Sequence, residues 1–339
     1  MKTRAVEFYS RGEKIVGTIY LPEDYNGKDK LPCLIPCSGY TGINAAYPAL
    51  LARLFTRHGY ACLGFDYRGW APSEGQPGHT TAEAEYDDIL SAYIFAQQQP
   101  EIQSENIGLF GWGFSAPTVL KIAADWLEIK AVGCGNGVYN GRRCLRTILN
   151  WPDYQKFDEI VRADLVQRVL TGKGAMMPPY QQMGATRCRS YTSGEWEPLT
   201  LDWLMNHVHK EAVRTEADTN HKKENFMDIE GVREAIIANY GALGNFPPKH
   251  GFESHESYLR IDSSYDVKKI SPRPIFIVHS KGDETYPISE AEAIASEIGE
   301  TCTTCYVEGT HNGFMFDDNP EFAKFSSAVI AFYDKALKA

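Results

Sequence analysis

Asn106-Ile-Gly-Leu-Phe-Gly-Trp-Gly-Phe-Ser-Ala-Pro-Thr-Val-Leu120 is the stretch that decides the fold of this 339-residue chain. It begins as an apolar run typical of a buried strand, passes through a glycine-flanked turn and continues into a helical pattern. A strand, a sharp turn and a helix are the setting of a nucleophile elbow, whose sequence is G-x-S-x-G. With Gly111 as the first glycine, Gly113 takes the nucleophile position and Ser115 takes the second small position.

Short apolar runs alternate with helical patterns on both sides of this turn. Leu31–Cys37 and Pro274–His279 are nearly continuous apolar runs, as expected of strands buried on both faces. The alternation predicts an α/β fold, with a mostly parallel sheet and helices on both faces. The expected strands are Lys14–Leu21, Leu31–Cys37, Tyr60–Asp66, Ile107–Trp112, Ile129–Gly135, Pro274–His279 and Thr301–Val307, and the expected helices are Tyr47–His58, Thr81–Gln98, Ala116–Trp126, Ser289–Ile298 and Glu321–Leu337.

The alternation stops after Gly137 and resumes near Ser271. The roughly 130 residues between are mostly helical in pattern, and they are too many for a loop in a compact domain. We therefore expect a helical cap, residues 138–270, inserted after the sixth strand of a core formed by residues 1–137 and 271–339. An independent second domain is less favoured, because the chain returns to complete the same sheet.

The elbow resembles the Gly-Thr-Ser-Phe-Ser-Gly-Gly elbow of α/β-hydrolases related to the fungal polyketide transferases and to the prolyl dipeptidyl peptidase and cocaine esterase group. In that elbow the first serine attacks the substrate and the second serine is structural. Ser115 matches the structural serine here, and Gly113 stands where the attacking serine is expected. The resemblance covers the core and is much weaker across the cap.

Three further loops carry the same resemblance. Pro36-Cys-Ser-Gly-Tyr-Thr-Gly42 matches the oxyanion loop of the relatives, with Ser38 in place of their histidine. Val278-His-Ser-Lys-Gly-Asp-Glu-Thr-Tyr-Pro287 matches the loop of the catalytic acid, which assigns that role to Asp283. The Gly-Thr-His-Asn-Gly segment matches the loop of the catalytic base, which assigns that role to His311. The order elbow, acid, histidine is the chain order of this fold.

The chemistry explains why these parts belong together. A histidine that moves protons needs an acceptor on one ring nitrogen to fix its tautomer, and Asp283 would supply that acceptor to His311. A carbonyl oxygen that becomes an oxyanion needs two preorganised donors. The resemblance implies that the backbone N–H groups of Phe114 and Tyr40 are these donors, and that the Tyr40 hydroxyl is a further one. The expected substrate-binding residues are Tyr40, Phe114, Ser38 and Trp112.

Some of these residues have alternatives. Asp283 has a structural alternative as a cap for the helix that follows it, since Asp is common just before helices. Glu284 is the backup acid. A nucleophile at Ser115 is less favoured than one at position 113, because Ser115 lies in the helix and matches the structural serine.

Glycine at position 113 is compatible with two types of reaction. In one interpretation the chain is a serine hydrolase or acyltransferase whose serine has been replaced, by engineering or otherwise. In the other it is a native protein in which Asp283 and His311 act as an acid–base pair in lyase, cyclase or isomerase chemistry. The favoured function is hydrolysis or transfer of an acyl group from an ester, thioester or polyketide-derived substrate. A non-catalytic binding protein is less favoured, because binding alone would not need an acid and a histidine at catalytic spacing.

The composition excludes several classes of partner. The net charge of -10 and the pI near 5.4 argue against nucleic acid and anionic membranes, which repel an acidic surface. No apolar run approaches the ~18 residues that span a bilayer, and the N-terminus runs directly into a strand-like pattern, so a cytoplasmic location is expected. No cofactor is expected, because the sequence has neither a phosphate-binding loop nor a dinucleotide fingerprint. The expected partner is a small-molecule substrate, and because many relatives form dimers a homodimer is considered.

The eight cysteines are scattered along the chain, and most are expected to be small buried hydrophobes. Cys302-Thr-Thr-Cys305 has the spacing of a redox or zinc pair. It lies in an extended run without a second pair or a histidine cluster, so no metal is expected there.

Overall fold

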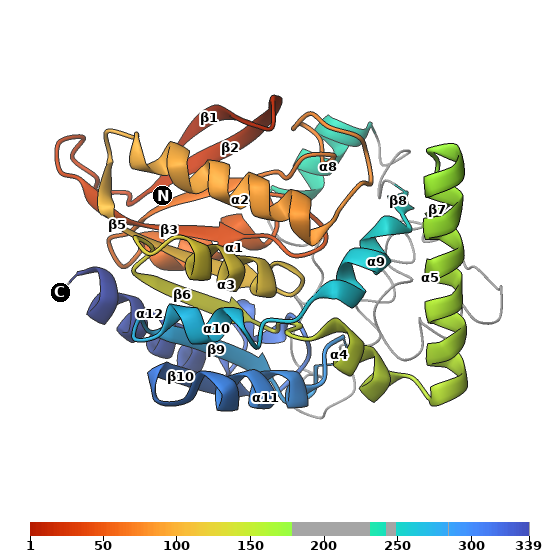
Figure 1. The fold of residues 1–339 in the computed structure, drawn as a ribbon. Coiled ribbons are helices and arrows are strands. Elements are labelled where there is room, and N and C mark those ends of the chain that lie inside the picture. The colour runs from red at the N-terminus through yellow and green to blue at the C-terminus, as the bar shows by residue number, and fades with distance from the viewer. Residues whose placement is uncertain (178–230, 242–248, 284, 339) are drawn as a thin grey trace.

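The computed structural model describes residues 1–177, 231–241, 249–283 and 285–338. In this part of the chain an eight-stranded sheet is flanked by helices, and a group of mainly helical elements lies at one end of it (Figure 1). The strands lie side by side in the order β1-β2-β4-β3-β5-β6-β9-β10. Their bounds are β1 (Lys2–Ser10), β2 (Glu13–Leu21), β3 (Leu31–Cys37), β4 (Ala61–Phe65), β5 (Ile102–Trp112), β6 (Ala131–Gly135), β9 (Ile275–Ser280) and β10 (Cys302–Val307).

The sheet is parallel except at its N-terminal edge, where β2 pairs antiparallel with both β1 and β4. Arg11 and Gly12 connect β1 to β2 with φ angles of 51° and 89°, the left-handed backbone of a tight hairpin turn. From β3 to β10 every pair is parallel, so all these strands end at the same edge. The predicted mostly parallel sheet is therefore confirmed.

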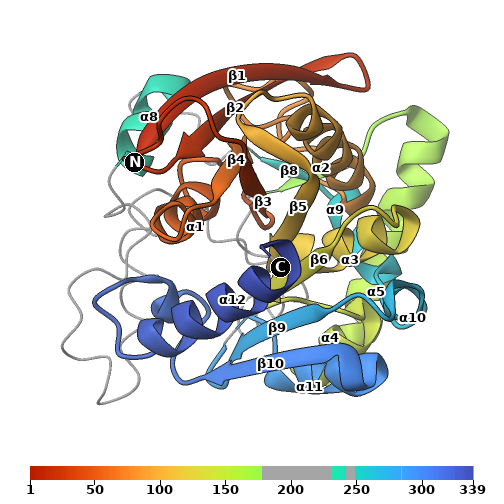
Figure 2. The ribbon, with the colours of Figure 1, turned by 90° about the vertical axis from the view of Figure 1, so that its left-hand side faces the viewer.

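Helices cover both faces of the sheet (Figure 2). The alternation of side chains along β3 shows the division, because Cys33 and Ile35 pack in the core beneath α2 and α3, whereas Leu34 packs beneath α1 and α12. None of the described helices is long and apolar enough to cross a membrane. The bounds are α1 (Tyr47–Thr56), α12 (Phe322–Leu337), α2 (Ala82–Gln97), α3 (Ser115–Asp125) and α11 (Ile288–Ile298).

After β6 the chain leaves the sheet and returns to it at β9. The described elements of this insertion are α4 (Gly141–Ile148), α5 (Trp151–Thr171), β7 (Met176–Met177), α8 (Val232–Tyr240), β8 (His250–Gly251), α9 (Glu253–Arg260) and α10 (Asp266–Ile270). Residues from α4, α5 and α9 form a separate apolar cluster, which also contains Phe114 and Tyr286 from loops of the core. The insertion thus packs over the edge where the parallel strands end.

The division of the chain into a core and a cap stays a prediction, and the structure describes only part of the expected cap. Residues 178–230 of the expected cap lie outside the described residues. Helix α10 falls within the expected cap by number, yet Val267 and Ile270 belong to the apolar core shared with α3 and α11. The pair β7–β8 is antiparallel and lies in a segment whose pattern predicted mainly helices.

One buried carboxylate fastens the insertion to the core. Glu290 of α11 is fully buried, and its oxygens accept hydrogen bonds from the side chain of Arg143 at 2.7 and 3.0 Å. The same carboxylate accepts from the backbone N–H groups of Tyr139 and Asn140, where the chain enters α4. A charge this deep in the protein is stable only when it is paired and hydrogen-bonded, and Glu290 is both.

A second buried carboxyl group, Asp66, holds the loop that follows β3. Its Oδ1 accepts a hydrogen bond from the backbone N–H of Asn44 at 2.9 Å. Burial raises the pKa of Asp66 from its ordinary value to about 8. Between about pH 4 and 8 the folded chain therefore holds a proton at Asp66 that the unfolded chain has lost.

Asp66→Asn keeps an oxygen acceptor for Asn44 but removes the titration. Because the folded pKa is raised, the stability due to protonated Asp66 is complete below pH 4 and is lost as the pH rises through 8. We expect the free energy of unfolding of the native chain to fall relative to the variant by up to ~1.4 kcal/mol per pH unit in this window. Urea denaturation at pH 5, 6.5 and 8 measures it, with exposed Asp24→Asn as the control. A difference that does not change with pH would contradict the assignment.

Candidate active site

The turn from β5 into α3 forms the centre of the site. Gly113 has a φ of +58°, the left-handed region that favours glycine, and its N–H donates to the carbonyl oxygen of Gly135 at 2.8 Å. A Cβ at Gly113 would lie 3.7 Å from the Nε2 of His311 and 3.7 Å from the ring of Tyr286. These are ordinary van der Waals distances, so the position that matches the family's serine is open and faces the histidine.

Ser115 holds this turn together. Its hydroxyl oxygen accepts a hydrogen bond from the backbone N–H of Trp112 at 3.1 Å and lies 3.3 Å from the carbonyl oxygen of Cys37. The side chain is fully buried. The geometry thus favours the structural role of Ser115 over the alternative in which this residue is the nucleophile.

Asp283 and His311 form a hydrogen-bonded pair. The Nδ1 of His311 lies 2.8 Å from the Oδ2 of Asp283. The Oδ1 of Asp283 accepts from the backbone N–H groups of Thr285 and Tyr286, at 2.7 and 2.9 Å, which fixes the carboxylate in place. Because an ionised carboxylate only accepts, Nδ1 carries the proton, and the lone pair of the neutral ring is on Nε2, on the side of Gly113. Glu284, the backup acid, lies outside the described residues.

The loop after β3 touches the elbow at the expected place. A Cβ at Gly39 would lie 2.9 Å from the carbonyl oxygen of Trp112, so only glycine allows this close approach. The next residue, Tyr40, meets the ring of Phe114 edge to face, with 5.6 Å between the ring centres. Phe114 is the N-cap of α3, a position whose N–H has no partner within the helix and is suited to bind an anion. The role of Tyr40 and Phe114 as oxyanion donors stays a prediction.

Ser38 and Trp112 are each engaged within the protein. The Ser38 hydroxyl donates to the carbonyl oxygen of Thr41 at 2.5 Å, which closes the loop after β3. The indole of Trp112 stacks on Tyr47, with ring centres 5.2 Å apart, and meets His311 edge to face at 5.8 Å. Both residues are 1% exposed, so Ser38 shapes the loop and Trp112 supports the histidine from beneath. Direct contact of either side chain with a substrate stays a prediction.

Asn136 is a site residue that the sequence analysis missed. It follows β6 with a φ of +41° and is fully buried. Its Oδ1 accepts from the backbone N–H of Ser280 at 2.7 Å, and its Nδ2 donates to the carbonyl oxygen of His311. Its own N–H donates to the carbonyl oxygen of Val278 at 2.9 Å. Asn136 thereby ties the end of β6 to the acid loop and to the histidine loop. The sequence feature that could have identified Asn136 is Gly-Asn-Gly at a strand end, because Asn tolerates left-handed backbone better than most residues.

His279 is a second supporting residue that the sequence analysis did not select. It is fully buried on β9, and its Nε2 lies 3.0 Å from the carbonyl oxygen of Tyr286 and 3.6 Å from the Oδ2 of Asp283. Burial lowers the pKa of His279, so the ring is neutral at pH 7. A neutral ring donates to Tyr286 and steadies the loop that presents Asp283.

The sequence of this chain is similar to a known protein family and to individual known proteins. Residues 11–225 match the family described as X-Pro dipeptidyl-peptidase (S15 family). The thiohydrolase aneE of Aspergillus aculeatus is 34% identical over 314 residues, which cover 91% of this chain and 86% of that protein. An uncharacterised 31.7 kDa protein of Escherichia coli is 33% identical over 120 residues, and the match spans 41% of its length.

Solved structures resemble this chain along its whole length. The hypothetical protein PA2218 of Pseudomonas aeruginosa superposes with a TM-score of 0.71 at 19% identity, covering 99% of this chain and 94% of that one. The α/β hydrolase GrgF from Penicillium sp. sh18 superposes with a TM-score of 0.70 at 17% identity and covers both chains completely. At these identities the likeness establishes the fold alone.

Gly113→Ser tests whether the site is built to hold a serine. The open space predicts that the hydroxyl fits beside His311, and the left-handed backbone predicts a loss of ~1–3 kcal/mol in the free energy of unfolding. We expect the variant to react with a fluorophosphonate probe at the introduced hydroxyl, whereas the native chain does not. Adding His311→Ala should abolish labelling. Labelling at Ser115, located by mass spectrometry, would refute this alignment of the elbow.

Asn136→Gly tests the link between the strand ends. Glycine keeps the left-handed backbone but removes all three side-chain hydrogen bonds, two with Ser280 and one with His311, so the loops of Asp283 and His311 lose their common anchor. In the Gly113→Ser background we expect the rate of fluorophosphonate labelling to fall ~100-fold, because small displacements of catalytic groups have effects of this size. Asn136→Asp keeps only the acceptor for Ser280. Its labelling rate should therefore lie between the rate with Asn136 and the rate of Asn136→Gly. An unchanged rate in a folded Asn136→Gly variant would show that the anchor is dispensable.

Proposed function

This chain belongs to the X-Pro dipeptidyl-peptidase (S15) family of α/β-hydrolases, and we propose that it hydrolyses or transfers an acyl group held as an ester or thioester. The observation that carries the proposal is the Asp283–His311 pair, whose Nε2 faces Gly113 beside the loop of Tyr40 and the N-terminus of α3. The thioester is favoured by the name of the relative aneE, a thiohydrolase that matches 91% of this chain. A polyketide-derived chain is one acyl group of this class.

The nucleophile in this reaction is a water or a hydroxyl group of the substrate, because Gly113 has no side chain. His311 takes the proton of that oxygen on Nε2 while the oxygen attacks the acyl carbon, and Asp283 stabilises the resulting imidazolium. The N–H groups of Phe114 and Tyr40 hold the oxyanion of the tetrahedral intermediate. As the intermediate collapses, the bond to the alkoxide or thiolate breaks, and this leaving group takes the proton from His311. No acyl-enzyme is formed.

The energetics favour an acceptor that belongs to the substrate itself. An enzyme of this type without its nucleophile keeps a residual ~10³–10⁴-fold acceleration over water from its oxyanion hole and binding energy. A hydroxyl held next to the acyl carbon has an effective concentration of ~10⁵–10⁸ M, which compensates for the missing serine. Transfer within one substrate molecule, which closes a lactone, is therefore the form of the reaction that suits this chain as it stands.

Lyase, cyclase or isomerase chemistry without acyl transfer is the second candidate. It is favoured by the burial of the Ser115 hydroxyl within the turn, which leaves the described site without a serine nucleophile. In that case His311 removes a proton from carbon and the oxyanion donors hold an enolate.

The proposal also includes the partners and the location of the chain. It has a small-molecule substrate, a cytoplasmic location and a homodimer, and no nucleic-acid or membrane partner.

The acyl proposal is tested with four chains: the native chain, Gly113→Ser, His311→Ala and Asp283→Asn. Each is assayed on acyl esters, acyl thioesters and thioesters of hydroxy acids long enough to cyclise. We expect Gly113→Ser to hydrolyse simple thioesters about a thousandfold faster than the native chain. The native chain should turn over the hydroxyacyl thioester, and His311→Ala and Asp283→Asn should each lower that rate ~10²–10⁴-fold.

The outcomes separate the candidates. If neither the native chain nor Gly113→Ser acts on any ester or thioester, and His311→Ala abolishes another turnover, the acyl proposal fails in favour of the second candidate. If His311→Ala changes no turnover at all, the site is not catalytic. Circular dichroism of each variant controls for folding.

A further inference from the structure

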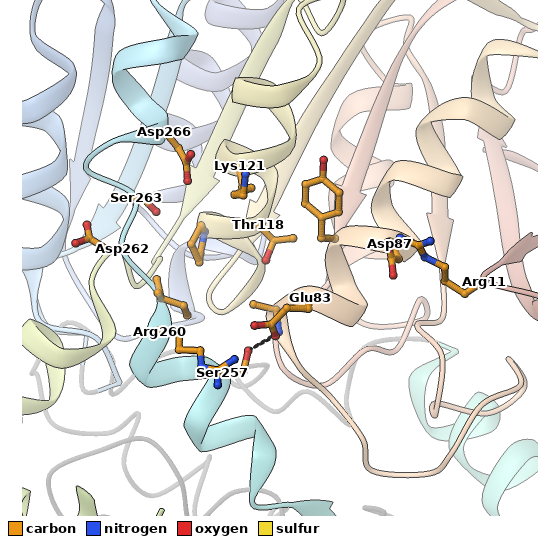
Figure 3. Close-up of a pocket in the computed structure, with 14 residues that line it drawn as sticks. Arg11, Glu83, Asp87, Thr118, Lys121, Ser257, Arg260, Asp262, Ser263 and Asp266 are labelled. Carbon is orange, nitrogen blue, oxygen red and sulfur yellow. Dashed lines mark hydrogen bonds and ion pairs between the residues drawn. The ribbon is translucent and has the colours of Figure 1, made fainter. Parts of the chain in front are cut away.

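A cavity of about 570 Å³ lies between α2, α3, the end of α9 and the start of α10 (Figure 3). Neither Gly113, Asp283 nor His311 lines it, so it is separate from the candidate active site. Its size is within the range of sites that hold small molecules. The charges on its walls define what kind of molecule fits.

The cations on its walls are already paired with carboxylates. Arg11 pairs with Asp87 at 2.8 Å, and both residues line the cavity. Lys121 pairs with Asp125 at 2.7 Å, one turn along α3. The third cation, Arg260, pairs with Glu256 of its own helix. None of these cations is left with an unmatched charge for an anionic ligand.

Three carboxylates on the walls have no cationic nitrogen closer than 4.0 Å within the described part of the chain. Asp266 is the least isolated of the three, because Lys269 lies 4.0 Å away and the charge of Lys121 also acts on it. Asp262 accepts hydrogen bonds only from Ser264, and the carboxylate of Glu83 accepts from the Ser257 hydroxyl at 2.7 Å. Burial raises the pKa of Asp266 and outweighs the opposing effect of Lys121 and Lys269, so the two lysines do not offset the burial of this carboxylate.

One neutral side chain on the walls, that of Thr118, also suits a cation. The hydroxyl of Thr118 is buried, with the residue 3% exposed, and it has no hydrogen-bond partner among the described residues. A buried hydroxyl without a partner costs free energy, so a ligand that donates a hydrogen bond to this oxygen would be favoured. Figure 3 places Thr118 on the wall between Lys121 and Glu83. The ring of Tyr86 also lines the cavity, but the ammonium group of Lys121 already lies over it, 5.9 Å from its centre.

We propose that this cavity binds a small organic cation that carries ammonium groups, such as a linear diamine or polyamine. Carboxylates at opposite walls suit a ligand with more than one positive charge, and the Thr118 hydroxyl suits one of its N–H donors. A metal ion fits less well, because the described residues contain no group of His, Cys, Asp or Glu arranged to hold one. The cavity is also far larger than an ion.

Binding here would also stabilise the wall of the active site. Ser257 of α9 accepts a hydrogen bond from the backbone N–H of Ala82 at 2.9 Å and donates to Glu83, so it joins α9 to α2 beside the cavity. The next residue, Tyr258, stacks on Phe114 of the elbow, with 6.3 Å between the ring centres. A cation held between α2 and α9 therefore favours the arrangement in which Tyr258 supports Phe114.

Isothermal titration calorimetry with spermidine and with 1,5-diaminopentane tests the site and requires no enzymatic activity, so the result is independent of the proposed acyl chemistry. We expect saturable binding at one site. The Asp262→Asn/Asp266→Asn double variant should weaken it at least tenfold. Asp24→Asn/Asp29→Asn, which removes the same charge from exposed positions elsewhere, should change it less than twofold.

Thr118→Val provides a second variant that keeps the shape of the side chain. It should leave the melting temperature of the ligand-free chain unchanged or higher, because it removes an unpaired buried hydroxyl, and it should weaken spermidine binding about threefold or more. The proposal is overturned if the native chain binds neither amine, if both double variants weaken binding equally, or if magnesium chloride at matched ionic strength displaces the amine while sodium chloride does not.

Discussion

The left-handed turn between β5 and α3 is the constraint from which the site follows. At Gly113 the chain reverses direction within the two residues between strand and helix, and the buried Ser115 hydroxyl fixes that reversal through the backbone of Trp112. The turn brings the start of α3 against the loop of Gly39, where a side chain would collide with the elbow. It also directs the open position at Gly113 towards His311. Every group of the candidate site is therefore placed relative to one backbone conformation.

A second network sets the acid and the histidine relative to this turn. Both residues lie on loops, and loops are positioned only as well as their anchors allow. The anchor here is buried: Asn136, at the end of β6, reaches the start of the Asp283 loop and the backbone of His311 at once. Since Gly113 also donates to the end of β6, the elbow, the acid and the histidine share one strand end as their reference.

The sequence predicted those features that depend on local pattern or on matched motifs. Seven of the eight sheet strands, the helices on both faces and the positions of Gly113, Asp283 and His311 at one edge follow from apolar runs and loop motifs, whereas β1 was not among the expected strands. What it did not predict depends on contacts between distant segments. Asn136 looks like an ordinary turn residue until its partners, about 140 to 175 positions later, are in place. Likewise, α10 belongs to the core because its apolar side meets α3, which no pattern within residues 138–270 could reveal.

The conformation of Gly113 is relevant to the reaction, because it shows that the turn keeps its shape without a serine at this position. A glycine could relax to many backbone angles, yet this one keeps the φ that a nucleophile elbow requires, because Ser115 and the loop of Gly39 still hold the turn. The turn therefore keeps its shape with glycine, and no serine, at position 113. If the acceptor is part of the substrate, the insertion must position it. The apolar cluster of the insertion includes Phe114, which follows Gly113 in the chain, and Tyr286, whose ring would lie 3.7 Å from a Cβ at Gly113. Substrate shape and reaction type would then be decided by the same packed surface, since that surface must present both the acyl carbon and the attacking hydroxyl to His311.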